Sequence, residues 1–182
     1  MKLTISCLAC LLAVFISAEG TCGSNPLSVV QALVEAERAA DLDAAVALFA
    51  DDAFISNVVG WKTANRDELR WFISTEIWMR DDFGLDHPRV DGNRVYWDEA
   101  AVGSFYQGIG VAPVRFTFAA IIEMGKIKSI VAHLPAEEIA RIREGCNAQA
   151  TEPLIYGRSC SEFVHLVEAH TSRRSHAVRP KP

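Results

Sequence analysis

Apolar residues recur at helical spacing in three stretches of the first eighty residues. In the first stretch, residues 26–40, the apolar stripe includes Val30 and Leu33, and an Asn-Pro pair opens it in the order of a cap and a first turn. The second stretch is capped by Asp41 and reaches residue 49, and the third begins near residue 65 with acids in its first turn. The pattern predicts three amino-terminal helices.

Strand-forming segments separated by turn residues make up much of the remaining chain. The clearest turns are Asp91-Gly92-Asn93 and Met124-Gly125-Lys126. A closing helix is expected from Pro135, with Gly145 as its stop, and the longest strand is expected to bend at Gly103. Helices followed by antiparallel strands predict an α+β domain. The strands are expected over residues 53–59, 94–106, 114–123 and 127–134.

The first twenty residues have the features of a cleavable signal peptide. Lys2 is followed by an apolar run over residues 8–16 and then by the small residues Ser17, Ala18 and Gly20. The run is too short to span a bilayer, and no later segment is apolar enough to do so. We therefore expect a secreted or extracytoplasmic protein with no integral membrane association after cleavage. The expected division is a signal peptide over 1–20, a domain over 25–145 and an extension over 146–182.

Three cysteines remain after this cleavage, namely Cys22, Cys146 and Cys160. Thiols oxidise outside the cytosol, so a disulfide between Cys146 and Cys160 could join the extension to the domain and leave one cysteine over. A zinc site is not expected, because the spacings lack the short paired ligand blocks that structural zinc prefers. We expect no other metal and no cofactor.

The charge is distributed unevenly along the chain. The net charge is −5, yet the last dozen residues contain only basic charges. The domain is therefore the more acidic part, which argues against a nucleic-acid surface on it. The basic tail is expected to be a solvated, disordered end.

Two segments resemble the SnoaL-like members of the nuclear-transport-factor-2-like superfamily. Residues 41–55, DLDAAVALFADDAFI, resemble the short second helix and first strand of that family. Residues 125–142, GKIKSIVAHLPAEEIARI, resemble its last hairpin strand and carboxyl-terminal segment. The resemblance covers about residues 25–144 and implies three helices packed on a strongly curved antiparallel sheet, with a closing helix and an apolar pocket on the concave face. The superfamily includes enzymes and non-enzymes, so the fold does not settle the function.

Ketosteroid isomerase, a relative in this superfamily, provides a test for catalytic residues. Its mechanism needs a carboxylate base, a tyrosine and a protonated aspartic acid. The resemblance aligns Asn57 with the base, Leu33 with the tyrosine and Thr117 with the acid. None of these side chains can perform the corresponding role, so this mechanism is disfavoured.

Strand alternation predicts which side chains line the pocket. If Thr117 faces inward, Arg115 does too, and the last strand contributes Ile130 and Leu134. The pocket is then mainly apolar, with Asn57, Thr117 and Arg115 as its polar groups and no carboxylate placed to remove a proton. Arg115 either binds a carboxylated ligand, bridges two carboxylates as in an epoxide hydrolase, or lies at the rim beside a surface acid.

Aromatic residues indicate two further surfaces. Trp71 and Trp78, seven positions apart on the third helix, either share a face above the pocket or pack in the core. A sheet that is apolar on both faces must be covered on both, so a homodimer packed sheet to sheet is expected. The second apolar face would carry Val114, Phe116, Phe118 and Ile122.

These features favour a secreted SnoaL-like protein that binds a small apolar or carboxylated molecule, with or without turnover. Two alternatives stay open. One is a cyclase, isomerase, dehydratase or epoxide hydrolase of the same superfamily, and the other is a non-catalytic interaction module that acts through its carboxyl-terminal extension. The candidate ligand contacts are Asn57, Arg115, Thr117, Leu33, Trp71, Trp78, Ile130 and Leu134.

Overall fold

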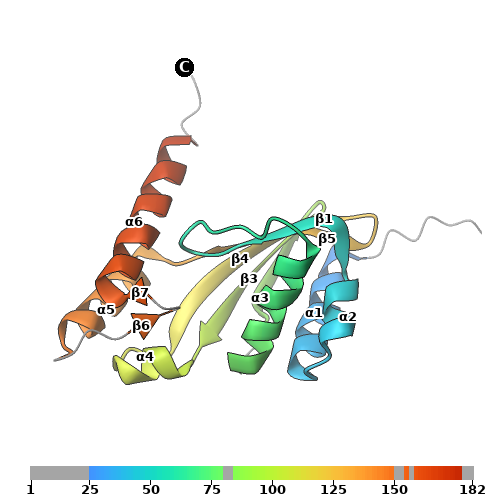
Figure 1. Ribbon diagram of the computed structural model, residues 1–182. Helices are drawn as coiled ribbons and strands as arrows, with labels where there is room; N and C mark the ends of the chain where they lie inside the picture. The colour runs from blue at the N-terminus through green and yellow to red at the C-terminus, as the bar shows by residue number, and fades with distance from the viewer. Residues whose placement is uncertain (1–24, 80–83, 150–153, 156–157, 178–182) are drawn as a thin grey trace, which may run out of the picture.

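The three amino-terminal helices form where the sequence predicts them. Helix α1 (Pro26–Arg38) begins after Asn25, whose side-chain oxygen accepts the N–H of Leu27 at 3.1 Å. Asp41 caps α2 (Leu42–Ala47) in the same way, and α3 is Arg66–Met79. The computed structural model describes residues 25–79, 84–149, 154–155 and 158–177 (Figure 1). The expected signal peptide and Cys22 lie outside the described residues.

A five-stranded sheet lies on one side of these helices (Figure 1). Strand β1 runs parallel to β5, and the other neighbouring strands are antiparallel. The predicted α+β class is confirmed, but the sheet is mixed, because α3 carries the chain from the first strand to the opposite edge and the following antiparallel strands return it to lie beside the first strand. In spatial order the strands are β1 (Phe49–Ser56), β5 (Lys126–His133), β4 (Val114–Glu123), β3 (Arg94–Ala101) and β2 (Asp86–Asp91).

Three strand boundaries differ from the prediction. β1 starts at Phe49 rather than at residue 53, and the Phe49 side chain is buried against the helices. β2 is not predicted, because all of its residues are exposed and it has no buried alternation. β3 ends at Ala101, and Gly103 caps the short helix α4 (Ser104–Gly108) instead of bending a strand.

The carboxyl-terminal part is helical beyond the predicted stop. Helix α5 (Ala136–Asn147) continues through Gly145, where a Cβ atom would lie 2.7 Å from the backbone oxygen of Ile109. Glycine therefore permits a close contact here and does not end the helix. After β6 (Leu154–Ile155) and β7 (Arg158–Ser159), α6 (Cys160–Ala177) continues into the tail in which the sequence predicts disorder.

Helix α6 packs on the domain at the end opposite α1 and α2 (Figure 1). A disulfide joins Cys146 in α5 to Cys160 at the start of α6. No helix in the described part of the chain combines the length and the apolar character that crossing a bilayer requires. The α6 side chains buried in the same cluster as residues of α5 and β4 are Phe163, Val164 and Val167.

One face of the sheet, called the inner face here, packs against the helices. Ile130 lies on this face, as predicted, but the predicted phase of β4 is wrong. Phe118 pairs with Ala132, so both must point the same way, and Arg115 and Thr117 therefore point to the outer face. On β3, β4 and β5 the inner face carries Val95, Trp97, Glu99, Ala101, Val114, Phe116, Phe118, Ala120, Ile122, Ile127, Ile130 and Ala132.

The outer face is consequently mixed in character. The four apolar residues expected on it lie on the inner face, where Val114 and Ile122 are buried and Phe116 and Phe118 are half-buried. The reason given for a homodimer therefore no longer holds, and the homodimer itself stays a prediction. On β4 the outer face carries Arg115, Thr117, Ala119 and Ile121.

Two apolar clusters hold the helices to the inner face. The first joins α1, α2 and α3 to the sheet through buried residues such as Val30, Leu69 and Ile73. The second joins α4, α5 and α6 to the far end of β3 and β4. Between the two clusters the inner face carries three side chains that are only half-buried, namely Glu99, Phe116 and Phe118.

Candidate functional site

The predicted ligand contacts do not converge in the structure. Leu33 and Ile130 are buried in the first apolar cluster, and Leu134 is buried in the second. Arg115 is exposed on the outer face, and Thr117 is half-buried on that same face. The sheet therefore separates the predicted polar contacts from the predicted apolar ones.

Asn57 has a structural role in the loop after β1. Its side-chain oxygen accepts the backbone N–H of Val59 at 3.2 Å and that of Trp61 at 3.0 Å. Its own backbone N–H donates to the carbonyl oxygen of Trp61 at 3.0 Å. The Asn57 side-chain oxygen is thus engaged in shaping this loop.

Trp71 and Trp78 lie on the solvent side of α3, where their side chains are 60% and 81% exposed. The Trp71 ring contacts the edge of Trp61, with centroids 6.1 Å apart, and Trp61 also stacks on Phe72. The expectation of core packing is therefore wrong for both residues.

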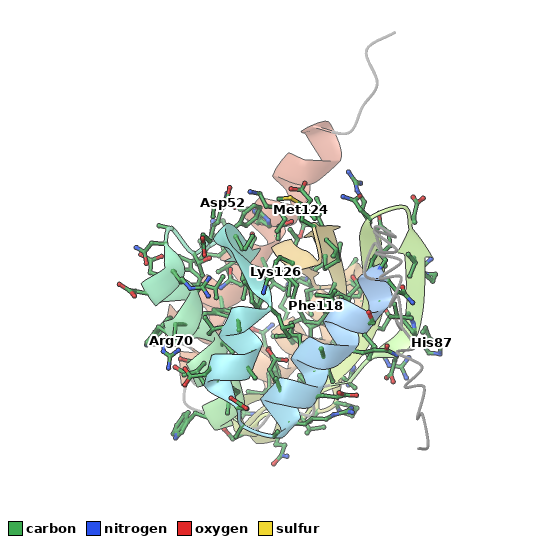
Figure 2. The ribbon with its side chains drawn as sticks, turned by 90° about the vertical axis from the view of Figure 1, so that its right-hand side faces the viewer. Asp52, Arg70, His87, Phe118, Met124 and Lys126 are labelled. Atoms are coloured by element: carbon green, nitrogen blue, oxygen red, sulfur yellow. A yellow bond between two sulfur atoms is a disulfide. The ribbon has the colours of Figure 1, made fainter. Side chains whose placement is uncertain are left out.

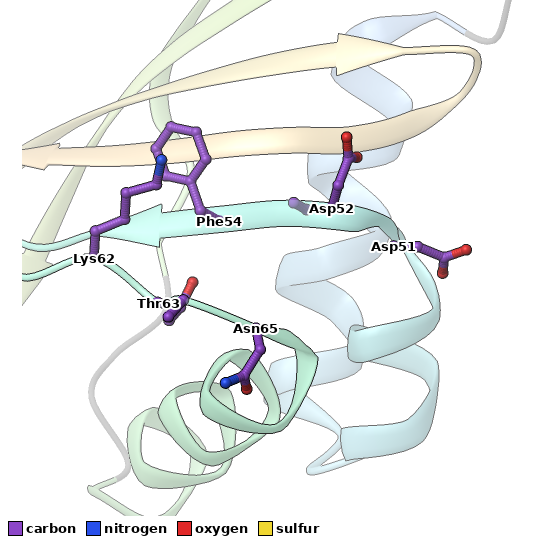
Figure 3. A pocket seen from close by; sticks show the side chains of 8 residues that line it. Asp51, Asp52, Phe54, Lys62, Thr63 and Asn65 are labelled. Atoms are coloured by element: carbon purple, nitrogen blue, oxygen red, sulfur yellow. The ribbon is translucent and has the colours of Figure 1, made fainter.

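A shallow depression beside β1 is lined by polar side chains that already have partners (Figure 3). The Lys62 ammonium lies 3.5 Å from the centroid of the Phe54 ring. Thr63 accepts the backbone N–H of Ile55 at 3.0 Å. A hydrogen bond from Lys128 lowers the pKa of the Asp52 carboxyl. These engaged groups make the depression a poor candidate for ligand recognition.

A row of aromatic rings runs along the inner face and connects the two apolar clusters. Trp97 stacks on Phe118 with ring centroids 5.1 Å apart, Phe116 lies 6.3 Å from Phe118, and Tyr106 lies 6.1 Å from Phe116. We call Trp97, Phe118, Phe116 and Tyr106 the aromatic row. Phe118 lies at the centre of the molecule, behind α1 and α2, whereas Arg70 and His87 lie at opposite edges (Figure 2).

The indole nitrogen of Trp97 has no hydrogen-bond partner among the described residues. The Trp97 side chain is only 5% exposed, so bulk water does not replace the missing acceptor. Most buried donors in proteins are hydrogen-bonded, and an exception calls for an explanation. This N–H group lies within the same stretch of inner face as the half-buried rings of Phe116 and Phe118.

Two carboxyl groups, Glu37 on α1 and Glu76 on α3, lie close enough for the charge of one to act on the other, and we call them the carboxyl pair. Glu37 lies on the stripe of α1 that includes Val30 and Leu33, and Glu76 follows Leu69 and Ile73 on α3. The two helices are in contact and run in the same direction below the sheet (Figure 1), which brings their carboxyl-terminal turns together.

Burial raises the pKa of the Glu37 carboxyl to about 8, and the nearby charge of Glu76 adds to this effect. Glu37 is therefore protonated at neutral pH and gives up its proton just above it. A carboxyl group with such a pKa can bind and release protons under physiological conditions. The residues predicted from the sequence do not include Glu37, whose side chain is half-buried near the end of α1.

Glu138 is a buried carboxylate with a structural role, and an arginine compensates its charge. Its side chain is 5% exposed and forms an ion pair with Arg141 at 2.6 Å. Arg141 also donates to the backbone oxygen of Pro113 at 3.1 Å, which ties α5 to the loop before β4. The carboxyl of Glu37 has no comparable cation among the described residues, and another carboxyl raises its pKa.

The sequence contains the signal that locates the carboxyl pair. Glu37 comes four residues after Leu33, and Glu76 comes three residues after Ile73, so each interrupts an apolar helical stripe. Such an acid is either half-exposed at the edge of a stripe or buried. The distinction depends on which helices become neighbours, and the pattern of one helix does not contain that information.

The described residues contain no group of three or more histidine, cysteine or acidic side chains arranged to hold a metal ion. The candidate site therefore consists of the aromatic row, the unpartnered indole N–H of Trp97 and Glu99 on β3, and the carboxyl pair lies apart from it on α1 and α3.

Comparison with known proteins identifies the fold. No protein-family model and no curated protein matches the chain. A nuclear-transport-factor-2-like protein of unknown function from Cytophaga hutchinsonii matches 64% of this chain and 95% of its own, with a TM-score of 0.51 and 11% identity. A putative polyketide cyclase from Sinorhizobium meliloti matches 60% of this chain and 99% of its own, with a TM-score of 0.51 and 21% identity.

A third solved structure is a hypothetical protein with a ketosteroid-isomerase-like fold from Catenulispora acidiphila, in complex with trimethylamine. It matches 62% of this chain and 90% of its own, with a TM-score of 0.51 and 15% identity. At these identities the similarity concerns the fold and not the reaction. The chain therefore has the nuclear-transport-factor-2-like fold that its sequence resembles.

Proposed function

We propose that this chain is an exported protein that binds a small molecule against the aromatic row of its inner face. The observation that carries the proposal is the buried indole N–H of Trp97, which has no acceptor among the described residues. A ligand oxygen would complete this hydrogen bond. The half-buried rings of Phe116 and Phe118 supply apolar surface beside it.

The position of Arg115 favours one of the two ligand classes expected from the sequence. A carboxylated ligand would have relied on an inward Arg115, but this residue lies on the outer face. An apolar ligand with a hydrogen-bond acceptor suits the inner face better. The trimethylamine complex of the protein from Catenulispora acidiphila also supports binding of small molecules by this fold.

Titration with prodan, a neutral naphthyl ketone whose emission depends on polarity, tests the proposal. We expect blue-shifted emission on binding, because the naphthyl ring leaves water and its ketone oxygen accepts the Trp97 N–H. Replacing Trp97 with Phe keeps an aromatic ring but removes the donor, and should weaken binding about fivefold. Trp78→Phe, at an exposed position, is the matched control. Equal affinities of the wild type and Trp97→Phe would count against this site.

A second candidate function is proton transfer at carbon, for which the pKa of Glu37 is the specific support. A carboxyl that titrates near neutrality suits a general base, and the Trp97 N–H would stabilise a developing enolate oxygen. Deuterium exchange into cyclohexanone, followed by NMR, tests this function. Exchange that is faster than in buffer and is abolished by Glu37→Gln supports it, whereas exchange at the buffer rate excludes it for this ketone.

Export is proposed from the signal-like first twenty residues. The disulfide between Cys146 and Cys160 supports an oxidising destination. The mass of the protein recovered after expression with its leader tests export. Loss of about the first twenty residues is the expected result, and an intact amino terminus in the cytosol contradicts it.

A further inference from the structure

We propose that the exposed tryptophans of α3 form a second binding site, which takes a neutral, extended oligosaccharide of β-1,4-linked pyranose units. The site lies on the solvent side of the helix and is separate from the aromatic row, so the inference goes beyond the proposed function. Three observations lead to it: the exposure of the rings, the neutral hydroxyl groups between them, and their spacing along the helix.

Three of the four tryptophans of the chain lie on this exposed surface. Trp61 is 37% exposed, and Trp71 and Trp78 are exposed further. Trp61 stacks on Phe72 and meets Trp71 at an interplanar angle of 81°, so Trp71 is held on one side while most of its ring faces water. Scattered single apolar residues are normal on a protein surface, whereas a group of exposed aromatic rings indicates a binding site.

The helix positions between the two outermost rings carry hydroxyl groups and no charge. Trp71, Ser74, Thr75 and Trp78 follow the spacing of one helix face, and we call them the tryptophan stripe. Ser74 and Thr75 donate their hydroxyl hydrogens to the backbone oxygen of Trp71, at 2.8 Å and 2.9 Å. Each hydroxyl oxygen can still accept a hydrogen bond. A neutral ligand that is rich in hydroxyl groups therefore suits the stripe.

The spacing of the two rings matches an extended sugar chain. Trp71 and Trp78 are seven residues apart, so they lie about 10.5 Å from each other along the helix axis and point within about 20° of the same direction. In a β-1,4-linked pyranose chain, every second unit recurs at a similar distance with the same orientation. The C–H groups of a pyranose face stack on the negative face of an indole ring. The first and third sugars can thus stack on the two indoles, with the second over the hydroxyl groups.

The exposed area and the local charges argue against two other occupants. The two indoles together expose about 350 Å² at most, whereas a standard protein interface buries about 800 Å² on each partner. A second copy of the chain would need far more surface than the stripe offers. An anionic membrane attracts basic surfaces, but Arg70, at the edge of the molecule beside the stripe, pairs with Asp43 at 2.7 Å (Figure 2).

Cellotetraose and maltotetraose provide a matched pair of probes. Both are neutral glucose tetramers, but the β-1,4-linked chain is extended and the α-1,4-linked chain is curved, so only cellotetraose can span both rings. Binding to the full chain is followed by the NMR resonances of the Trp71 and Trp78 indole N–H groups, each assigned from its loss in the corresponding alanine variant. Cellotetraose should shift both resonances and bind about fivefold more tightly than maltotetraose.

Variants of the stripe locate the sugar. Trp71→Ala and Trp78→Ala should each weaken cellotetraose binding about tenfold, because each removes one stacked sugar. Both positions are exposed and alanine favours a helix, so the melting temperature should stay close to that of the wild type. Met124→Ala, at an exposed apolar residue elsewhere, and Trp97→Phe, on the inner face, are the controls and should keep the full affinity.

The remaining outcomes would overturn the inference. These are equal affinities for the two tetramers, shifts confined to Trp97, or no shift at all. A dimer in light scattering that Trp78→Ala converts to a monomer would identify a second copy as the occupant. Sedimentation with phosphatidylcholine vesicles that requires both rings of the stripe would identify a lipid surface. Prodan binding at Trp97 is measured independently, so failure at the stripe leaves the proposed function standing.

Discussion

Glu37 occupies a position four residues after Leu33 on α1, where helical spacing favours an apolar side chain. Its burial has a cost, because the charged form loses its hydration, and its raised pKa expresses that cost. A single acid of this kind can be noticed in the sequence. Its partner Glu76 cannot be assigned to it from the sequence, because Glu76 comes from another helix.

The raised pKa of Glu37 predicts that stability falls as pH rises. Its folded pKa of about 8 exceeds the ordinary value of 4.5 for a glutamate, so the folded state holds the proton more tightly. The contribution is fully present below the unfolded pKa and is lost as pH rises through 8, amounting to about 5 kcal/mol at most. Urea unfolding between about pH 5 and pH 9 measures this slope.

Two variants separate the Glu37 contribution from the rest of the molecule. Glu37→Gln should flatten the dependence of the unfolding free energy on pH, since an amide does not titrate. Glu35→Gln, on the same helix but exposed, should leave the slope unchanged. A slope that persists in Glu37→Gln would assign it to other groups.

At the scale of elements, the sequence alone does not determine which face of β4 points towards the helices. Phe116 and Phe118 alternate with Thr117, Ala119 and Ile121, so both faces of this strand contain apolar residues. The alternation alone therefore fits either phase. Pairing with β5 decides between them, because Phe118 lies opposite Ala132 and the two share the inner face. The three helices were predictable, since each has an apolar stripe and a polar cap.

Helix α6 escaped prediction for a different reason. Its apolar residues Phe163, Val164 and Val167 occupy little more than one turn, and its carboxyl-terminal half is polar and basic. Periodicity over so short a stretch is weak. The helix forms because it packs on α5 and is tied to it by the disulfide.

Removing the disulfide should loosen α6 and destabilise the second apolar cluster. The two cysteines are 14 residues apart, and closing a loop of that size contributes about 3 kcal/mol. The double variant Cys146→Ser, Cys160→Ser should lower the unfolding free energy by about that amount and speed amide exchange in α6. Cys22→Ser is the control. Unchanged exchange in α6 would mean that packing alone holds this helix.

At the scale of the whole molecule, two apolar clusters hold the helices on one curved sheet, and a half-buried aromatic stretch lies between them (Figure 1). The fold class was predictable from the order of helices and strands. The site was not, because it is formed by α1, α3, β3 and β4, which meet only in the folded molecule. The polar ligand contacts predicted from the sequence, Arg115 and Thr117, depended on which face of β4 points inward, and the predicted face was the wrong one.

The homodimer stays a prediction at this scale, with an outer face that is mixed rather than apolar. Ala119 occupies the middle of that face, between Tyr96 and Val131. If two sheets pack there, Ala119→Arg should convert a dimer to a monomer in light scattering at micromolar concentration, because it buries a charge without a partner. A wild-type protein that is already monomeric would contradict the prediction.

A crystal structure of the protein with prodan bound tests the proposed binding site most directly. We expect the naphthyl ring against Phe116 and Phe118, with the ketone oxygen accepting the Trp97 N–H. Prodan bound instead on the exposed ring of Trp71 or in the depression beside Asp52, with none on the inner face, would show that the aromatic row is not the binding site.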